Sequence, residues 1–256
     1  MWRSLKLRRK LLHGLVVLPV ACLTLLFLPS ASGATENSLK EILQLVFERA
    51  AAKEADFRPY GFRRDGRTRV WNGDDELEEE TRLLGRYVRW SADSTETVEE
   101  KEEVIFSSEG EEAEKVDGKD AESTEGEEHE EKMSFDMDFW SPEKRKLYRF
   151  QLEGPKDWNG REAVVLKLRP KKKRKELWKG LVWLDPRTGA LLATDLEPAK
   201  RRFGMKSMRV RKDYKELDDM SVPARIRIDV EAKLPLIFHI RINMEMNFSE
   251  YRFIGD

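Results

Sequence analysis

The side chains that usually perform catalysis or hold a transition metal are scarce in this chain. It has three histidines, His13, His129 and His239, and one cysteine, Cys22. Once an N-terminal export signal is removed, this set excludes a cysteine nucleophile, a disulfide framework and a His/Cys metal centre. The sequence has no glycine-rich phosphate loop and no Ser-His-Asp order, and nothing selects a catalytic pair among its many carboxylates. We therefore predict a protein that is not an enzyme, with no catalytic residue, no metal and no cofactor.

A different chemistry, the binding of an apolar ligand, is indicated by strands that carry one apolar face. In the last predicted strand two methionines stand among isoleucine and phenylalanine, which makes an adaptable apolar surface. Core packing is the simpler interpretation, but a sheet covered by a single helix could leave a gap wide enough for an acyl chain. The candidate lipid-binding residues are Phe135, Met137, Phe139, Trp183, Ile226, Ile228, Ile240, Ile242, Met244, Met246 and Phe248.

A run of five basic residues, Lys171, Lys172, Lys173, Arg174 and Lys175, stands close to Trp178. The plainest interpretation is a solvated hairpin tip. The alternative is contact with anionic lipid headgroups or with a partner, since each exposed Lys or Arg near an anionic surface contributes about 1 kcal/mol and indoles favour membrane interfaces. Nucleic acid is not expected as a partner, because the aromatic residues lie mainly on apolar strand faces rather than among the basic ones.

Charge is strongly segregated along the 256 residues, although the formal net charge is only -1. Residues 99–132 hold 16 acidic and 4 basic residues, whereas residues 141–212 hold 22 basic and 8 acidic ones. The acidic stretch cannot bury enough apolar surface to offset its ordering entropy, so we predict an acidic disordered insert over 95–132. Calcium binding is disfavoured because the regular Asp spacing of a calcium loop is missing. The insert could instead fold back on the basic half.

The N-terminus has the pattern of a secretory signal. A basic head precedes an apolar run over 11–28, and the small residues 31–33 follow Pro29. We predict a signal peptide over 1–33, cleaved after Gly33, and a single domain over 34–256 in the periplasm. An uncleaved inner-membrane anchor formed by 11–28 and a lipoprotein acylated at Cys22 are the alternatives.

The remaining pattern predicts one helix followed by strands. Apolar residues recur at three- and four-residue steps from Ser38 to Glu54, with Asn37 or Ser38 as the N-cap. Residues 58–73 look basic and turn-rich, and a strand is expected at 87–91. About seven strands with short turns follow residue 132, including a hairpin at Asn159-Gly160. Short connections force antiparallel neighbours, so we expect one curved antiparallel sheet whose apolar face is covered by the helix.

Residues 133–253 resemble a known family. The segments that carry the resemblance are Leu147-Tyr148-Arg149-Phe150, Trp158-Asn159-Gly160-Arg161-Glu162-Ala163-Val164-Val165-Leu166, Leu168-Arg169-Pro170-Lys171, Gly180-Leu181-Val182-Trp183-Leu184-Asp185, Val222-Pro223-Ala224-Arg225 and Phe248-Ser249-Glu250-Tyr251-Arg252. Their order is similar to that of the outer-membrane lipoprotein-sorting superfamily, the LolA-like proteins. The resemblance implies a mainly β (α+β) fold, an open antiparallel half-barrel with one or two helices covering its concave apolar face.

The resemblance also implies a function. LolA-type members carry the acyl chains of lipoproteins across the periplasm, and relatives bind other lipids or sense stray lipoproteins. The expected function is therefore that of an exported lipid- or lipoprotein-binding protein involved in carrying or sorting lipoproteins to the outer membrane. An envelope-stress sensor or protein-interaction module on the same fold, with no transported lipid, is the alternative. The acidic insert departs from the family pattern.

Overall fold

The computed structural model describes residues 32–55, 57–91, 94–108, 139–234 and 238–255. In this part of the chain two helices and ten strands follow one another. They are α1 Ser32–Ala55, β1 Tyr60–Trp71, β2 Leu77–Arg89, β3 Thr95–Ser107, α2 Pro142–Arg145, β4 Tyr148–Trp158, β5 Arg161–Pro170, β6 Trp178–Leu184, β7 Leu191–Pro198, β8 Met205–Leu217, β9 Met220–Leu234 and β10 Phe238–Phe253.

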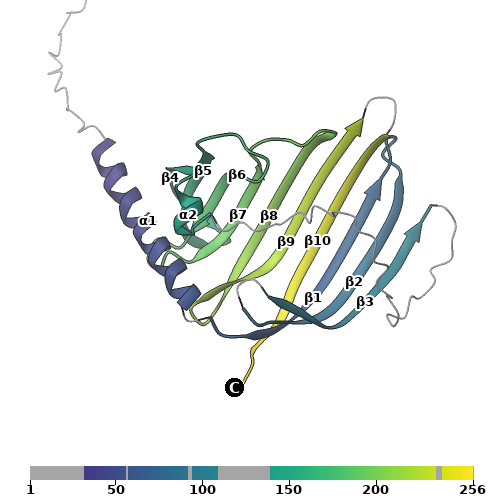
Figure 1. Cartoon of the computed structure of the whole chain (residues 1–256), viewed down its shortest axis with the longest axis horizontal. Helices are drawn as coiled ribbons and strands as arrows, with labels where there is room; N and C mark the ends of the chain where they lie inside the picture. Colours follow the sequence, from purple (N-terminus) through teal and green to yellow (C-terminus); the bar gives the residue numbers. More distant parts are fainter. Residues whose placement is uncertain (1–31, 56, 92–93, 109–138, 235–237, 256) are drawn as a thin grey trace, which may run out of the picture.

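All ten strands belong to one antiparallel sheet in the order β3-β2-β1-β10-β9-β8-β7-β6-β5-β4. Most neighbours are joined by short turns, and the pairing of β1 with β10 unites the first three strands with the last seven. The edge strands β3 and β4 are not paired with each other, so the curved sheet stays open (Figure 1). The mainly β half-barrel expected from the sequence is confirmed.

Two strands were missed by the sequence analysis. The segment expected to be turn-rich contains β1, and the first third of the predicted disordered insert is β3. The prediction of disorder is wrong for Thr95–Ser107, because these acidic residues pair with a strand that supplies opposite charges. Arg86 forms an ion pair with Glu99, for example, and Arg64 of β1 reaches Glu100. The rest of the insert lies outside the described residues.

The helix α1 packs on one face of the sheet, which we term the helix-side face. Its Ile42 and Val46 join a buried cluster with Leu166, Val182 and Val210 from β5, β6 and β8. The helix begins at Ser32, before both predicted cap residues. In the described part of the chain neither helix extends over β10, β1 or β2, so the cover stops part-way across the sheet (Figure 1).

The opposite face of the same strands, the outer face, carries paired charges. Arg209 and Arg211 share Asp195, and Arg225 and Arg227 share Glu245. This alternation follows from the two-residue period of a strand and confirms the expected contrast between an apolar and a basic face. The hairpin expected at Asn159-Gly160 is also present, with both residues at positive φ.

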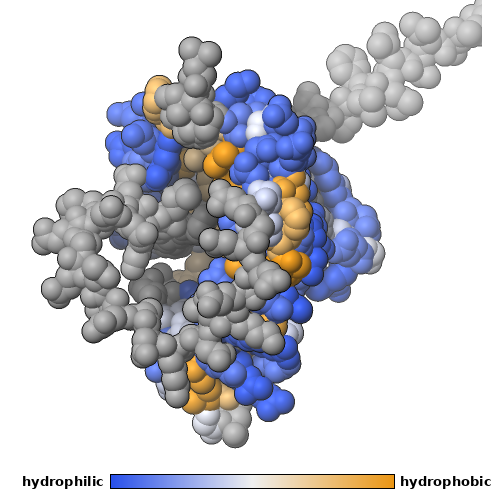
Figure 2. Space-filling view, turned by 90° about the vertical axis from the view of Figure 1, so that its right-hand side faces the viewer, coloured by the Kyte–Doolittle hydropathy of each residue, from blue (hydrophilic) through white to orange (hydrophobic). Residues whose placement is uncertain are grey.

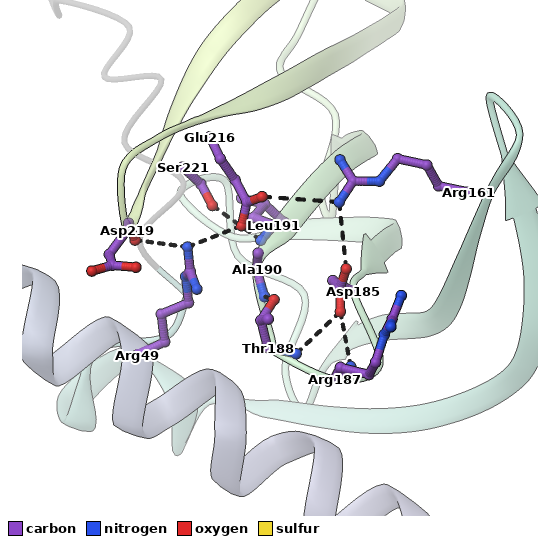
Figure 3. A network of polar contacts seen from close by, with 10 residues as sticks. All are labelled: Arg49, Arg161, Asp185, Arg187, Thr188, Ala190, Leu191, Glu216, Asp219 and Ser221. Carbon is purple, nitrogen blue, oxygen red and sulfur yellow. Dashed lines mark hydrogen bonds and ion pairs between the residues drawn. The ribbon is translucent and has the colours of Figure 1, made fainter.

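A polar network fixes the C-terminal part of α1 to the turns of the sheet (Figure 3). Arg49 donates to the carbonyl oxygen of Asp219 over 2.7 Å and to Glu216 over 3.4 Å, in the turn region between β8 and β9. Arg161 of β5 reaches both Glu216 and Asp185. Arg49 is the helix residue in this network and ties the C-terminal part of α1 to the turn between β8 and β9.

We expect Arg49→Ala to lower the free energy of unfolding by about 1–2 kcal/mol, because a half-buried guanidinium and a backbone carbonyl both lose their partner. Urea denaturation measures the change. Arg86→Ala is the matched control, since Arg86 and Glu99 are largely exposed and 4.0 Å apart, and such surface pairs contribute little. Equal losses in both variants would show that the Arg49 contacts do not hold the helix.

The described residues contain no helix that is both long enough and apolar enough to cross a membrane. The predicted signal peptide, the alternative anchor over 11–28 and the acylation site at Cys22 all lie outside the described residues.

Candidate functional site

The helix-side face continues past the cover of α1 as an apolar stretch on β9 and β10. Met244 stands opposite Ile228, and Met246 stands opposite Ile226; directly opposed residues share one face of a sheet. Ile228 is buried, whereas Ile226, Met244 and Met246 are only partly buried and pack against the edge of the main cluster. We term these four residues the apolar stretch.

The next strand adds little apolar surface of its own beside the two methionines. On β1 the residues opposite Met244 and Met246 are Thr68 and Gly66. Thr68 has a short side chain and Gly66 has none, so β1 provides little apolar cover. Figure 2, which views the molecule from the β3 side, shows hydrophobic residues at the surface between hydrophilic ones. An apolar surface that is formed by strands and bordered at one side by a helix can remove a flexible hydrocarbon chain from water.

Six of the predicted lipid-binding residues come together on this face. Ile226, Ile228, Met244 and Met246 form the apolar stretch, Ile242 continues it beside Val230, and Phe248 extends it toward Phe62 at a ring distance of 5.9 Å. Ile240 lies further along β10, opposite Ala232. Phe139 is almost fully buried in the main cluster beside Trp140. Phe135 and Met137 lie outside the described residues.

Trp183 is not part of the apolar stretch. It alternates with Val182 and Leu184, whose side chains belong to the buried cluster, so it lies on the outer face. There its ring stands 5.1 Å from that of Trp158 and lines a hollow of about 320 Å³ that is otherwise bordered mainly by charged residues. The prediction that Trp183 belongs to the lipid-binding face is wrong, because β6 carries apolar residues on both faces and so shows no alternation.

A polar cluster that the sequence analysis missed adjoins the Phe248 end of the apolar stretch. Arg64 of β1 stands opposite Phe248, donates to Tyr87 of β2 and forms a 3.0 Å ion pair with Glu100 of β3; Tyr87 in turn donates to Glu100. The Nε atom of Arg64 is buried and has no hydrogen-bond partner among the described residues. Because β1 and β3 were not recognised as strands, no sequence pattern could bring these three residues together.

Burial raises the pKa of all five tyrosines of the chain, Tyr60, Tyr87, Tyr148, Tyr214 and Tyr251. For Tyr87 the loss of hydration and the hydrogen bond to Glu100 raise the pKa to about 12. A raised pKa of a neutral acid means that the folded protein holds the proton more tightly than the unfolded chain does. The stability that this contributes is complete below the unfolded value, near pH 10, and is lost as the pH rises above it.

We therefore expect the tyrosinate absorbance of the folded protein to stay low up to about pH 11. When the protein unfolds at higher pH, the tyrosinate absorbance should rise in one step, because the tyrosines of the unfolded chain ionise near pH 10. A pH titration by ultraviolet absorbance, with a parallel titration in guanidinium chloride, measures both curves. Ionisation of the folded protein with a midpoint near that of the denatured chain would show that the phenols are solvated.

The basic run and Trp178 are separated by the structure. Lys171, Lys172, Lys173, Arg174 and Lys175 are all exposed in the loop between β5 and β6. Trp178 is buried in the main cluster, and its backbone N–H donates to the hydroxyl of Tyr148. It is therefore not available at the surface, as the prediction of a headgroup contact required, and acts as an anchor for the loop.

A family model matches residues 92–251, which is more than half of the chain, and is described as a family of unknown function, DUF5686. The chain belongs to this family. A search of the curated proteins finds no match. The match begins just before β3 and ends within β10, so the family spans the apolar stretch but not α1.

Three solved structures are similar to the chain. A DUF1329 family protein from Desulfovibrio piger is 14% identical with a TM-score of 0.38, covering 86% of this chain and 95% of its own. A domain assigned to outer membrane lipoprotein sorting from Vibrio parahaemolyticus is 14% identical with a TM-score of 0.37, covering 84% and 93%. A LolA superfamily protein from Nitrosomonas europaea is 11% identical with a TM-score of 0.32, covering 85% and 94%.

Two of these three proteins bear the name of the superfamily that the sequence resembles. Their TM-scores are too low to carry an inference on the function of this chain. The proposals below therefore depend on its own residues.

Proposed function

We propose that the protein binds a lipid acyl chain on the helix-side face of β9, β10 and β1. The observation that carries this proposal is the partial burial of Met244 and Met246 on a face that α1 leaves uncovered. A closed core would bury these side chains, whereas a purely structural surface would replace them with polar residues. An acyl chain laid over them would remove apolar surface from water at about 25 cal/mol per Å².

The polar cluster at one end of this face suits a lipid headgroup. Arg64 stands next to Phe248 in the ladder, and its side chain is partly exposed. A carboxyl, ester or phosphate oxygen could accept from it while the hydrocarbon lies toward Met246. Glu100 neutralises part of the Arg64 charge, which favours a weakly charged headgroup over a multiply charged one.

Carriage or sorting of lipoproteins is the more specific form of this proposal. It also requires export by the predicted signal peptide over 1–33 and a periplasmic location. A lipoprotein supplies an acyl chain that cannot stay free in water, so a carrier with an open apolar face would hold it between membranes. On this proposal the partner is the lipid or lipoprotein acyl chain and no cofactor takes part.

Native mass spectrometry of the protein purified without detergent tests the proposal. We expect a discrete adduct with the mass of a lipid or an acylated peptide, removed by organic extraction and restored by incubation with lipid vesicles. The bare mass of the chain, unchanged after incubation with vesicles, would refute acyl-chain binding. It would favour the alternative in which the same fold is an envelope-stress sensor or protein-interaction module.

A further inference from the structure

Two basic loops meet at one end of the sheet. The loop between β5 and β6 spans residues 171–177, and the loop between β7 and β8 spans 199–204. They are joined directly, because the backbone N–H of Ala199 donates to the carbonyl of Leu177 over 2.7 Å. We term this end of the sheet, with its two loops, the basic edge.

The basic edge carries a strong positive charge. Within the two loops, eight basic residues are accompanied by one acidic residue, Glu176, which pairs with Arg174. The basic residues are Lys171, Lys172, Lys173, Arg174, Lys175, Lys200, Arg201 and Arg202. On the outer face of the sheet, by contrast, arginines share carboxylates within the sheet itself. Apart from Arg174 and Arg202, the basic residues of the two loops are therefore available to an external partner.

An aromatic side chain projects from the middle of this charge. Phe203 is 95% exposed, well above the other large hydrophobic residues that are exposed. It stands at the tip of a turn closed by the Met205 N–H donating to the carbonyl of Arg202 over 3.1 Å, with Gly204 at a φ of +77°. Positive φ at the third position is the mark of a turn that needs glycine there.

The turn that presents Phe203 is tied to the sheet. The N–H of Lys233, on β9, donates to the carbonyl of Gly204 over 2.7 Å. Beneath the neighbouring loop, Leu177 and Trp178 are buried in the main cluster. The basic edge is thus a platform with fixed backbone hydrogen bonds. Because the backbone that carries the aromatic ring is already fixed, the ring loses little conformational freedom when a binding partner buries it.

We infer that the basic edge docks the protein on an anionic phospholipid surface, with Phe203 inserted at the level of the headgroups. Phosphate groups of the lipids would pair with the lysines and arginines, and the ring would leave water for the membrane interface. A soluble polyanion would satisfy the charges but would leave Phe203 in water. A hydrophobic protein patch would bury the ring but would desolvate the lysines and arginines around it without offering them an opposite charge. A lipid surface accommodates both.

Vesicle co-sedimentation tests this inference with two lipid compositions. The purified protein should bind vesicles of phosphatidylglycerol mixed with phosphatidylcholine, and should bind pure phosphatidylcholine weakly. Binding should fall steeply with salt, because the Debye length shortens to about 3 Å at 1 M ionic strength. Equal binding to both compositions, or binding unaffected by salt, would overturn the inference.

Two variants separate the charge from the ring. Replacing Lys171, Lys172 and Lys173 by Ser should weaken vesicle binding about a hundredfold. The matched control replaces Arg63, Arg86 and Lys156 by Ser, which removes the same charge from exposed positions away from the basic edge. Phe203→Ser should weaken binding about tenfold, whereas Ile254→Ser, at another exposed apolar residue, should not.

The outcomes discriminate between the partners. If Phe203→Ser binds vesicles as the unaltered protein does, the basic residues alone account for binding. A soluble polyanion then replaces the membrane as the partner. If the two charge variants lose binding equally, net charge rather than the basic edge is responsible. Neither result bears on the acyl-chain proposal, because lipid adducts are measured by mass on the protein free of vesicles.

Discussion

Met244→Asp should abolish the co-purification of lipid while the protein still folds. Met244 is partly buried at the centre of the apolar stretch, between Ile228 on β9 and Thr68 on β1. A carboxylate there would have to be desolvated against hydrocarbon, which costs about 2 kcal/mol or more and corresponds to at least a tenfold loss of bound lipid. Native mass spectrometry on detergent-free protein, with the melting temperature measured in parallel, gives both readouts.

Two further variants make this prediction specific. Asn247→Asp adds the same charge on the exposed outer face of β10, so it should retain the full amount of lipid. Thr68→Phe keeps the face apolar but fills the flank of Met244, so it should displace lipid without adding charge. Lipid that persists in both Met244→Asp and Thr68→Phe would show that it binds elsewhere on the protein.

The sequence predicted the face that carries the candidate site but not its boundaries. Alternation along β10 placed Met244, Met246 and Phe248 correctly, because a half-buried antiparallel strand shows its two faces as two residue classes. The same rule failed for Trp183, since both faces of β6 carry apolar residues. A strand with apolar residues on both faces contains no alternation that distinguishes the inner face from the outer one.

The high content of charged residues is the reason that β3 was predicted to be disordered. A strand such as β3, with five glutamates in thirteen residues, has the composition of a disordered segment when it is taken alone. It is ordered because β2 offers it a full ladder of backbone partners and because Arg64 forms an ion pair with Glu100. Such pairing is non-local, so no window of a single sequence reveals it. The Arg64, Tyr87 and Glu100 cluster could not be found for the same reason.

The position of a tight turn, in contrast, was predicted correctly from its residue types. Asn159-Gly160 forms the hairpin that its residue types indicate. The role of the Phe203-Gly204 pair was invisible, since a turn between two strands can present its side chain to solvent or to the core. Only the packed position of Ala199 against Leu177 shows that this turn stands beside the basic run.

Gly180→Ala should cause one of the largest losses of stability that a single methyl group can produce in this fold. A Cβ at Gly180 would lie 2.1 Å from the carbonyl oxygen of Asp195 and 3.0 Å from the Cα of Leu196. Both contacts are with the backbone of β7, which is paired to β6 at this point, so no side-chain rotation can relieve them. We expect a loss of about 3 kcal/mol or more in the free energy of unfolding and a fall in melting temperature of roughly 6–12 °C.

Gly154→Ala isolates the contribution of the clash. Gly154 also has positive φ, +105° against +147° for Gly180, but a Cβ there would meet nothing within 4 Å. The free energy of unfolding of Gly154→Ala should therefore fall by only about 1 kcal/mol, the cost of holding alanine at a positive φ. Chemical denaturation of both variants measures the difference. Similar losses would mean that backbone conformation alone requires Gly180, whereas a larger loss for Gly180→Ala would show that close contact between β6 and β7 requires a glycine next to the buried anchor Trp178.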